Sequence, residues 1–325
     1  MKSSLKLRGK NSKSLSIKDE KMLGEVCYWI LNMSIMASVM GLIVMLLIQI
    51  REIPRRVAVF LWIIPFIRMT LPFGLSSRFS LMSLISKFTT RTITVFEPVN
   101  EVEFSFTNTI MAADTYSPLT YKTKMLENIF AISGFVWIII ALAIIIALTI
   151  LYISTKREIS DAKLMEQNVF MSGKVDSPAV YGIFRPKIII PASYKDRDLT
   201  YIIRHEKMHI RRLDNLWRMV GFIVAAVHWF NPLSWVFLKA FLADLELACD
   251  EMAVKGLKTA ERKAYAMTLL DSTNSKSMLV SAFGGAKVRT RIENVLSYKQ
   301  MTLVSAIGFT LLVMVIVFAL VTNAG

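Results

Sequence analysis

The stretch YIIRHEKMHIRRLDN, residues 201–215, decides the fold and chemistry expected of this chain, because it places two histidines four positions apart. Residues four apart share one face of a helix, so His205 and His209 would present neighbouring imidazoles to one tetrahedral metal ion. Glu206 follows the first histidine and is placed to take a proton from a water molecule that the metal polarises. Two of the chain's three histidines lie in this pattern. We therefore predict a metallopeptidase site on a helix from Leu199 to Arg212.

A second helix is predicted at residues 241–253, where Glu246 and Asp250 lie four apart on one face. Its other residues are mostly apolar, which indicates a buried helix in which carboxylates need partners. We expect Glu246 to be the third metal ligand and Asp250 to accept a hydrogen bond from a ligand histidine. Two histidines and one carboxylate leave a fourth position for water, which is typical of a catalytic zinc site. The expected cofactor is therefore Zn2+.

Three further residues each allow two interpretations. Cys249 could ligate the metal, but on a helix it points away from the direction of Glu246. Asp214 could hold a ligand histidine or lie at a solvated helix end. His228 could polarise a substrate carbonyl, or it could belong to an aromatic membrane interface beside Trp229. The sequence does not identify the group that stabilises the oxyanion.

Apolar residues make up 54% of the chain and occur in long blocks, which indicates a membrane protein. Val26 to Ile50 and Ile129 to Ile153 carry no charge, and Leu303 to Val321 is a third uncharged run. Val57 to Leu75 is a weaker candidate because it contains Arg68 and two prolines, and it would have to be a kinked span supported by its neighbours. We expect about four transmembrane helices.

The net charge of +15 is spread along the segments between these runs, as membrane topology requires, and no basic run is interleaved with aromatic residues. Direct binding of nucleic acid is therefore not expected. Basic residues lie near both ends of residues 154–300, next to the adjoining spans, which predicts that this segment is cytoplasmic. The N-terminal tail is also basic, although three spans would put it outside. Either residues 57–75 do not span the membrane, or the charges of the other loops outweigh those of the tail, and we favour the second explanation. The predicted order is a basic tail at 1–25, transmembrane helices 1 and 2 at 26–75, an extracytoplasmic loop at 76–128, transmembrane helix 3 at 129–153, a cytoplasmic catalytic domain at 154–300, transmembrane helix 4 at 301–322 and a short tail at 323–325.

The fold class expected is therefore a mainly α polytopic membrane protein with an α+β catalytic domain. Within that domain, Ser177 to Pro191 predicts a β-hairpin that either receives an extended substrate or only covers the site helix, whereas Ser160 to Phe170 is predicted to be helical or irregular. Met219 to Leu238 is an uncharged run whose straight passage through a bilayer would separate Glu246 from the histidines. Asn231-Pro232 offers a break, so we predict a re-entrant or interfacial helical hairpin.

Five segments in this order resemble the membrane zinc metallopeptidases of the β-lactam-sensing antirepressors, the BlaR/MecR type: SPAVYGIFRPKIIIPASY, RHEKMHIRRLDN, FNPLSW, LELACD and SAFGGAKVRTRIENVLSYK. The resemblance implies a gluzincin-type protease domain between the third and fourth spans. In it, His205, His209 and Glu246 match the zinc ligands and Glu206 matches the catalytic glutamate.

The resemblance also implies proteolysis that relieves gene repression, often with self-cleavage, for which Ala282-Phe283 is the first bond to examine. Antibiotic-sensing members continue beyond the last span into an extracellular penicillin-binding domain, whereas this sequence ends at Gly325. The sensor would then be a separate protein, the 76–128 loop or absent. Expected partners are membrane lipid and a cytoplasmic protein substrate such as a transcriptional repressor. Alternatives are a housekeeping protease for membrane-protein quality control and a non-catalytic receptor or scaffold with structural zinc.

Overall fold

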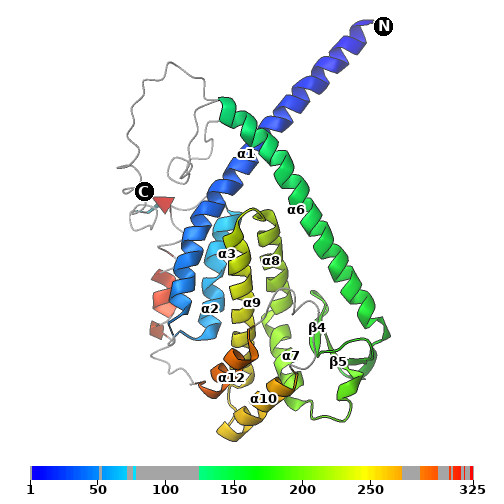
Figure 1. Ribbon diagram of the computed structural model, residues 1–325, viewed down its shortest axis with the longest axis vertical. Coiled ribbons are helices and arrows are strands. Elements are labelled where there is room, and N and C mark those ends of the chain that lie inside the picture. The colour runs from blue at the N-terminus through cyan, green and yellow to red at the C-terminus, as the bar shows by residue number, and fades with distance from the viewer. Residues whose placement is uncertain are drawn as a thin grey trace. The chain divides into compact units, whose positions relative to one another are not determined.

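The computed structural model describes residues 2–50, 53–71, 76–77, 124–272, 286–298, 307–308, 310–315, 318 and 323–324. Its helices and strands are labelled in Figure 1. The chain divides into two compact units. The first comprises Met1–Leu42, Ile64–Ala143 and Met314–Gly325, and the second comprises Ile43–Ile63 and Ile144–Val313. The second unit contains the predicted metal site.

Among the residues that the structure describes, two helices are long and apolar enough to cross a membrane. Helix α1 is Lys2–Ile48 with a candidate span at Met22–Ile48, and α6 is Lys124–Glu158 with a candidate span at Ile132–Asp161. They coincide with the first and third predicted transmembrane helices. Only 6% of the most apolar part of the second span is buried within the protein, as expected of a helix that faces lipid. The tail predicted at residues 1–25 is helical from Lys2 onward and continues directly into the first span.

The second predicted span, residues 57–75, is two short helices within the described residues. Helix α2 is Arg55–Leu61 and α3 is Ile63–Thr70, with a turn at Trp62 between them. Pro65 explains the interruption, because its missing N–H cannot bond to a carbonyl in the preceding turn, whereas the first turn of a new helix tolerates proline. Neither helix alone has the roughly 20 residues that cross a bilayer.

Much of two other predicted segments lies outside the described residues. Of the fourth predicted span, the described positions 307–308, 310–315 and 318 are helical. Of the predicted 76–128 loop, the structure describes strand β1 (Ser76–Ser77), which pairs in parallel with β6 (Asn323–Ala324), and the first residues of α6.

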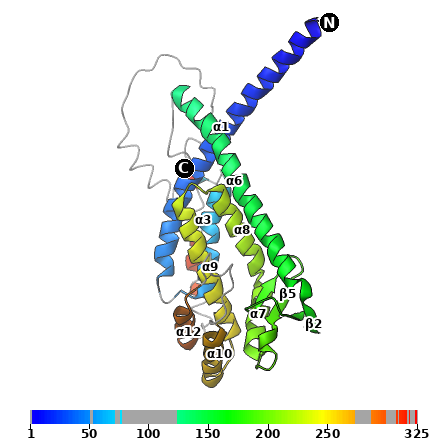
Figure 2. The same ribbon diagram turned by 45° about the vertical axis from the view of Figure 1, so that its right-hand side comes forward.

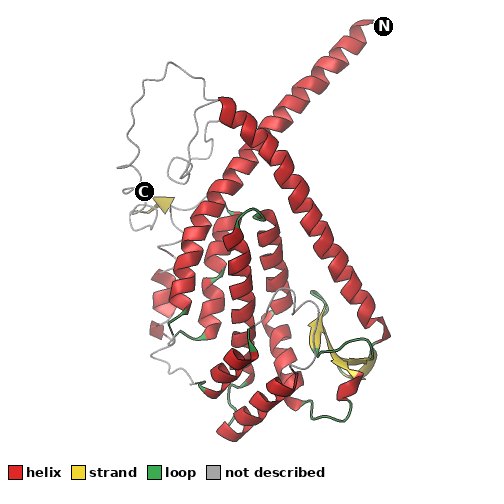
Figure 3. Cartoon of the chain, in the orientation of Figure 1, coloured by secondary structure: helices red, strands yellow, loops and turns green. Residues whose placement is uncertain are grey.

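A four-stranded sheet lies beside the site helix in the second unit, with strand order β2-β3-β5-β4 (Figure 3). The strands are β2 (Lys163–Glu166), β3 (Val169–Ser172), β4 (Ala179–Tyr181) and β5 (Lys187–Pro191). Strands β4 and β5 form the predicted hairpin, with Val180 opposite Ile188, so that prediction is confirmed. The helical or irregular segment predicted at residues 160–170 is wrong, because β2 and β3 form there. All of β2 is exposed, so it lacks the alternation of buried and exposed residues by which a strand is recognised.

Between residues 192 and 298 the described part of this unit is mainly helical, and its helices are seen from two sides in Figures 1 and 2. They are α7 (Thr200–Arg212), α8 (Asp214–Val227), α9 (Pro232–Ala253), α10 (Thr259–Ser272) and α12 (Val288–Leu296), with single 3-10 turns at Ile159–Asp161 and Ala192–Tyr194. The predicted break between α8 and α9 is present: the Asn231 side chain accepts a hydrogen bond from the Leu233 N–H at 3.0 Å, and Pro232 opens α9. The hairpin therefore returns α9 alongside α7.

Candidate metal centre

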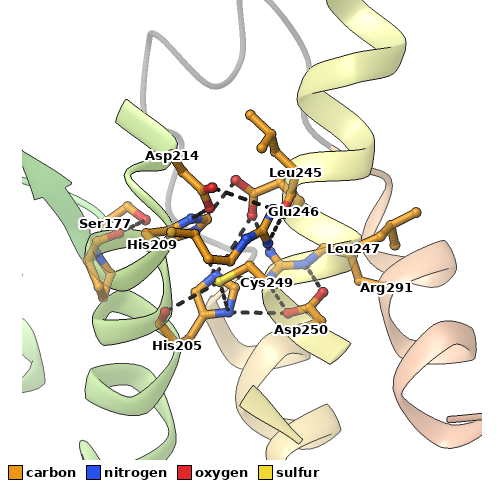
Figure 4. A network of polar contacts seen from close by, with 12 residues as sticks. Ser177, His205, His209, Asp214, Leu245, Glu246, Leu247, Cys249, Asp250 and Arg291 are labelled. Atoms are coloured by element: carbon orange, nitrogen blue, oxygen red, sulfur yellow. Dashed lines mark hydrogen bonds and ion pairs between the residues drawn. The ribbon is translucent and has the colours of Figure 1, made fainter. Parts of the chain in front are cut away.

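Helix α7 holds the two motif histidines and the glutamate between them in buried positions. The Nε2 atoms of His205 and His209 lie 3.1 Å apart (Figure 4). Their rings are nearly perpendicular, with centroids 4.7 Å apart. The i,i+4 spacing has therefore brought both Nε2 atoms to one point, as predicted from the sequence.

Helix α9 brings a carboxylate to the same point. Glu246 Oε1 is 3.7 Å from His209 Nε2, and Glu246 Oε2 is 3.8 Å from His205 Nε2. Burial raises the pKa of Glu246, but the positive charges of His209, Arg218 and Arg291 and the hydrogen bond to His205 outweigh it, so the pKa lies well below its ordinary value. The carboxylate is therefore ionised and faces both imidazoles.

Cys249 is an alternative third ligand. The ligand atoms of His205, His209 and Cys249 all lie within 4.8 Å of one another, which makes them a possible metal-binding group among the described residues. The thiol Sγ lies 3.7 Å from Nδ1 of His205 and 3.4 Å from its carbonyl oxygen. From the sequence we expect Glu246, rather than Cys249, to be the third metal ligand. The structure brings both close to the histidines, although Glu246 faces the Nε2 atom of His205 and the thiol contact is with its Nδ1.

A buried carboxylate lies against the Nδ1 atom of each histidine. Asp214 Oδ2 is 2.7 Å from His209 Nδ1, and Asp250 Oδ1 is 3.2 Å from His205 Nδ1. Tyr265 hydroxyl contacts the same His205 Nδ1 at 2.8 Å and donates to Asp250 at 2.7 Å. Such partners fix the tautomer that leaves Nε2 free for a metal.

The position of Asp214 depends on the joint between two helices. Leu213 has a left-handed backbone with φ of 57°, which ends α7 and starts α8 at once. This sharp joint turns Asp214 back onto the histidine five residues earlier. Burial lowers the pKa of His209, but the negative charges of Cys249 and Glu246 and the hydrogen bond to Asp214 raise it to about 9.

The sequence did not identify two arginines at the site. Arg291 on α12 donates to both carboxylate oxygens of Asp250, at 2.7 and 2.8 Å, and its Nη2 is 3.3 Å from His205 Nε2. Arg218 on α8 forms an ion pair with Glu246. Arg291 gives no local signal, because its partner lies 41 positions away. Arg218 could have been noticed as a charge at the edge of an apolar run.

Glu206, which follows His205 on α7, is buried. Burial raises the pKa of Tyr181 on strand β4, and the negative charges of Glu158, Glu206 and Asp176 raise it further. Strand β4 is an edge of the sheet, and Asn215 donates to the carbonyl of Val180 in this strand and to that of Gly182 just after it, at 2.9 and 3.0 Å. The glutamate therefore lies within electrostatic range of an edge strand whose position Asn215 fixes.

The remaining candidates lie elsewhere. His228 is buried in the turn between α8 and α9, where its Nδ1 contacts the Val224 carbonyl at 3.1 Å and its own carbonyl accepts from Ser234. These contacts favour a structural role. The predicted cleavage bond Ala282-Phe283 lies outside the described residues.

The chain resembles known proteins over most of its length. The family described as BlaR1 peptidase M56 matches residues 28–295. Regulatory protein BlaR1 of Bacillus licheniformis is 26% identical over 151 residues, which are 42% of this chain and 25% of the relative. The methicillin resistance mecR1 protein of Staphylococcus aureus is 26% identical over 114 residues, 34% of this chain and 20% of the relative. Regulatory protein BlaR1 of Staphylococcus aureus is 27% identical over 158 residues, which are 44% of this chain and 27% of the relative. The chain thus spans about a quarter of the length of these relatives.

Proposed function

Because the chain belongs to the BlaR1 peptidase M56 family, we propose that it is a multi-pass membrane zinc metalloendopeptidase that acts in transmembrane signalling. The observation that carries the proposal is the convergence of two histidine Nε2 atoms, 3.1 Å apart, with the Glu246 carboxylate within 3.8 Å of both. The family membership supports the peptidase activity. The names of the relatives, which are regulatory and methicillin-resistance proteins, support a signalling role in an antibiotic response.

The donor set suits zinc. Imidazole nitrogen and carboxylate oxygen are its usual ligands in catalytic sites, and the buried carboxylates on both Nδ1 atoms are the partners that such histidines usually have. His205, His209 and Glu246 would hold the ion, with Cys249 as the alternative third ligand. Bound zinc supplies a Lewis acid that polarises a peptide carbonyl and a water molecule.

The protein's own groups would then carry the remaining chemistry. Glu206 takes a proton from the attacking water and delivers it to the leaving amine. Asp214 and Asp250 hold the ligand imidazoles in one orientation. Arg218 holds the Glu246 carboxylate, and Arg291 keeps Asp250 ionised against its histidine.

We propose that the catalytic domain is cytoplasmic and of the gluzincin type, and that its substrate is a cytoplasmic protein such as a transcriptional repressor. Strand β4 lies at an edge of the four-stranded sheet, which supports binding of an extended chain by strand addition, provided that Asn215 releases the carbonyls of Val180 and Gly182. Self-cleavage at Ala282-Phe283 belongs to the same proposal. It follows from the resemblance to the antirepressors.

The test uses purified full-length protein in lipid nanodiscs and a quenched fluorescent peptide library. Wild type is compared with Glu206→Gln, which keeps the size of the side chain, and with Glu166→Gln on the exposed strand β2. We expect wild type and Glu166→Gln to cleave the same peptides, and Glu206→Gln to bind equal zinc without cleaving. Equal cleavage by all three would assign it to a contaminating protease. Zinc binding without cleavage by any of them would favour the non-catalytic scaffold.

A further inference from the structure

Helix α9 carries two pairs of acidic residues on different sides. At about 100° per residue, Asp244 and Glu251 point in nearly the same direction, and Glu246 and Asp250 project roughly 130° away from them. The second pair faces the histidines of α7. The first pair is also buried, at 5% and 8% exposure, although it takes no part in the metal centre. Buried carboxylates are costly unless they have partners, and α2 provides them.

Glu251 caps the beginning of α2. Its Oε1 accepts the Arg55 backbone N–H at 3.0 Å, and its Oε2 lies 3.4 Å from the Arg56 backbone N–H as a second hydrogen bond. The first N–H groups of a helix have no acceptor within the helix, and a negative charge there is favourable. The N-cap residue of α2 is Pro54, which provides no side-chain cap. The cap of α2 is therefore supplied by α9.

Asp244 binds the other end of the same short helix. Its Oδ2 accepts the indole N–H of Trp62 at 2.8 Å in a buried hydrogen bond. Its Oδ1 is 3.4 Å from Nη1 of Arg55, and that nitrogen also donates to the carbonyl of Ile48, the last residue of α1, at 3.5 Å. The two carboxylates of α9 thus contact both ends of α2. Through Arg55 they also lie next to the last residue of α1, whose C-terminal part is a candidate membrane span.

We propose that Asp244 and Glu251 are positioning residues that couple the junction of α1 and α2 to the metal-binding side of α9. The inference rests on the proposed function, because it treats Glu246 as a metal ligand. A packed helix moves as one body, so a displacement of α2 that is transmitted through its contacts with Asp244 and Glu251 also shifts Glu246 relative to the α7 histidines. The contact is the route by which a change in the membrane helices alters metal binding.

Coupling of this kind is reciprocal. The factor by which an intact contact strengthens metal binding equals the factor by which the bound metal strengthens the contact. The Arg55 and Arg56 amides report the contact directly, because without the Glu251 carboxylate they have no acceptor within their helix and exchange with solvent rapidly.

The experiment measures hydrogen exchange at these two amides in full-length wild type in nanodiscs, with zinc bound and after removal by a chelator. We expect zinc to slow exchange by roughly 5-fold or more. In parallel, zinc affinity is measured by chelator competition. Glu251→Ala should weaken it by about tenfold, Glu251→Gln should weaken it less because the amide still accepts one hydrogen bond, and Glu166→Gln should leave it unchanged.

The outcomes separate this inference from the proposed function. Slower exchange with zinc, together with the graded loss of affinity, supports the coupling. Wild type that binds zinc with no change in exchange at Arg55 and Arg56 overturns the coupling and leaves the metallopeptidase proposal intact. Wild type that binds no zinc overturns both. Because the exchange measurement needs no substitution, the test does not depend on the folding of any variant.

Discussion

The ion pair between Arg291 and Asp250 gives the sharpest prediction about stability. Arg291 lies on α12 and makes two charge-assisted hydrogen bonds, at 2.7 and 2.8 Å, to a carboxylate that is 0% exposed. Burial raises the pKa of Asp250, but Arg291 lowers it by more, with a smaller contribution from His205, to about 2. Replacing Arg291 with Met keeps the unbranched apolar part of the side chain and removes the guanidinium group. Asp250 would then be a buried carboxylate with Tyr265 and His205 as its remaining neighbours.

The expected cost is about 3–5 kcal/mol, because breaking a buried pair leaves a charge without compensation. Two hydrogen bonds to a charged group, at about 1.5–3 kcal/mol each, give a similar figure. In a domain of about 150 residues, a loss of 1 kcal/mol in the free energy of unfolding lowers Tm by about 2–4 °C, so we expect Tm to fall by on the order of 10 °C. The folded pKa of Asp250 is below its unfolded value, so the stabilisation is present above about pH 4 and is lost as the pH falls toward 2.

The assay is thermal unfolding of the chelator-treated full-length protein in nanodiscs. Arg289→Met is the matched control, since Arg289 lies on the same helix, is 90% exposed and pairs with Glu293 on the surface; its Tm should equal that of wild type. Asp250→Asn combined with Arg291→Met should recover part of the loss, because no buried charge remains unpaired. If Arg291→Met and Arg289→Met have the same Tm, the buried ion pair does not stabilise the protein.

Three other predictions follow from the contacts of α8 and α9. Asp214→Asn should weaken zinc binding by about 10- to 100-fold in chelator competition, because it removes the charge that orients His209; equal affinity would contradict this role. Gly221→Val should lower stability by about 1–3 kcal/mol in thermal unfolding, because even a Cβ at Gly221 would lie 2.9 Å from Leu238 Cδ1; an unchanged Tm would show that the two helices can separate without cost. Asn231→Ala should cost about 1 kcal/mol in the same assay through loss of the α9 cap, and no change would mean that the cap does not contribute.

Local periodicity accounts for the parts of the site that could be predicted. The i,i+4 spacing of the two histidines gives their convergence directly, and the same spacing puts Glu246 and Asp250 on one side of α9. The break at Asn231 follows from the proline after it. These features depend on short stretches of chain, where the geometry of a helix is enough to place the side chains.

The parts that could not be predicted depend on contacts between distant segments. Arg291 and Tyr265 reach Asp250 from 41 and 15 positions away, and nothing in their own neighbourhoods distinguishes them from other surface or core residues. Strand β2 is exposed along its length and exists because β3 pairs with it. The role of Glu251 as a cap for α2 spans 196 positions and is visible only in the folded chain.

The most direct test of the account is the identity of the metal and its third ligand. Zinc content is measured by elemental analysis for wild type, Glu246→Gln and Cys249→Ser in nanodiscs, and each protein is also loaded with Co2+ for absorption spectroscopy. We predict one zinc ion per chain in wild type and in Cys249→Ser, and a zinc affinity about tenfold or more weaker in Glu246→Gln. We also predict that the cobalt spectrum of wild type has no sulfur-to-metal charge-transfer band. A sulfur-to-cobalt band that disappears in Cys249→Ser, with zinc binding unchanged in Glu246→Gln, would contradict the account and assign the third ligand to the thiol.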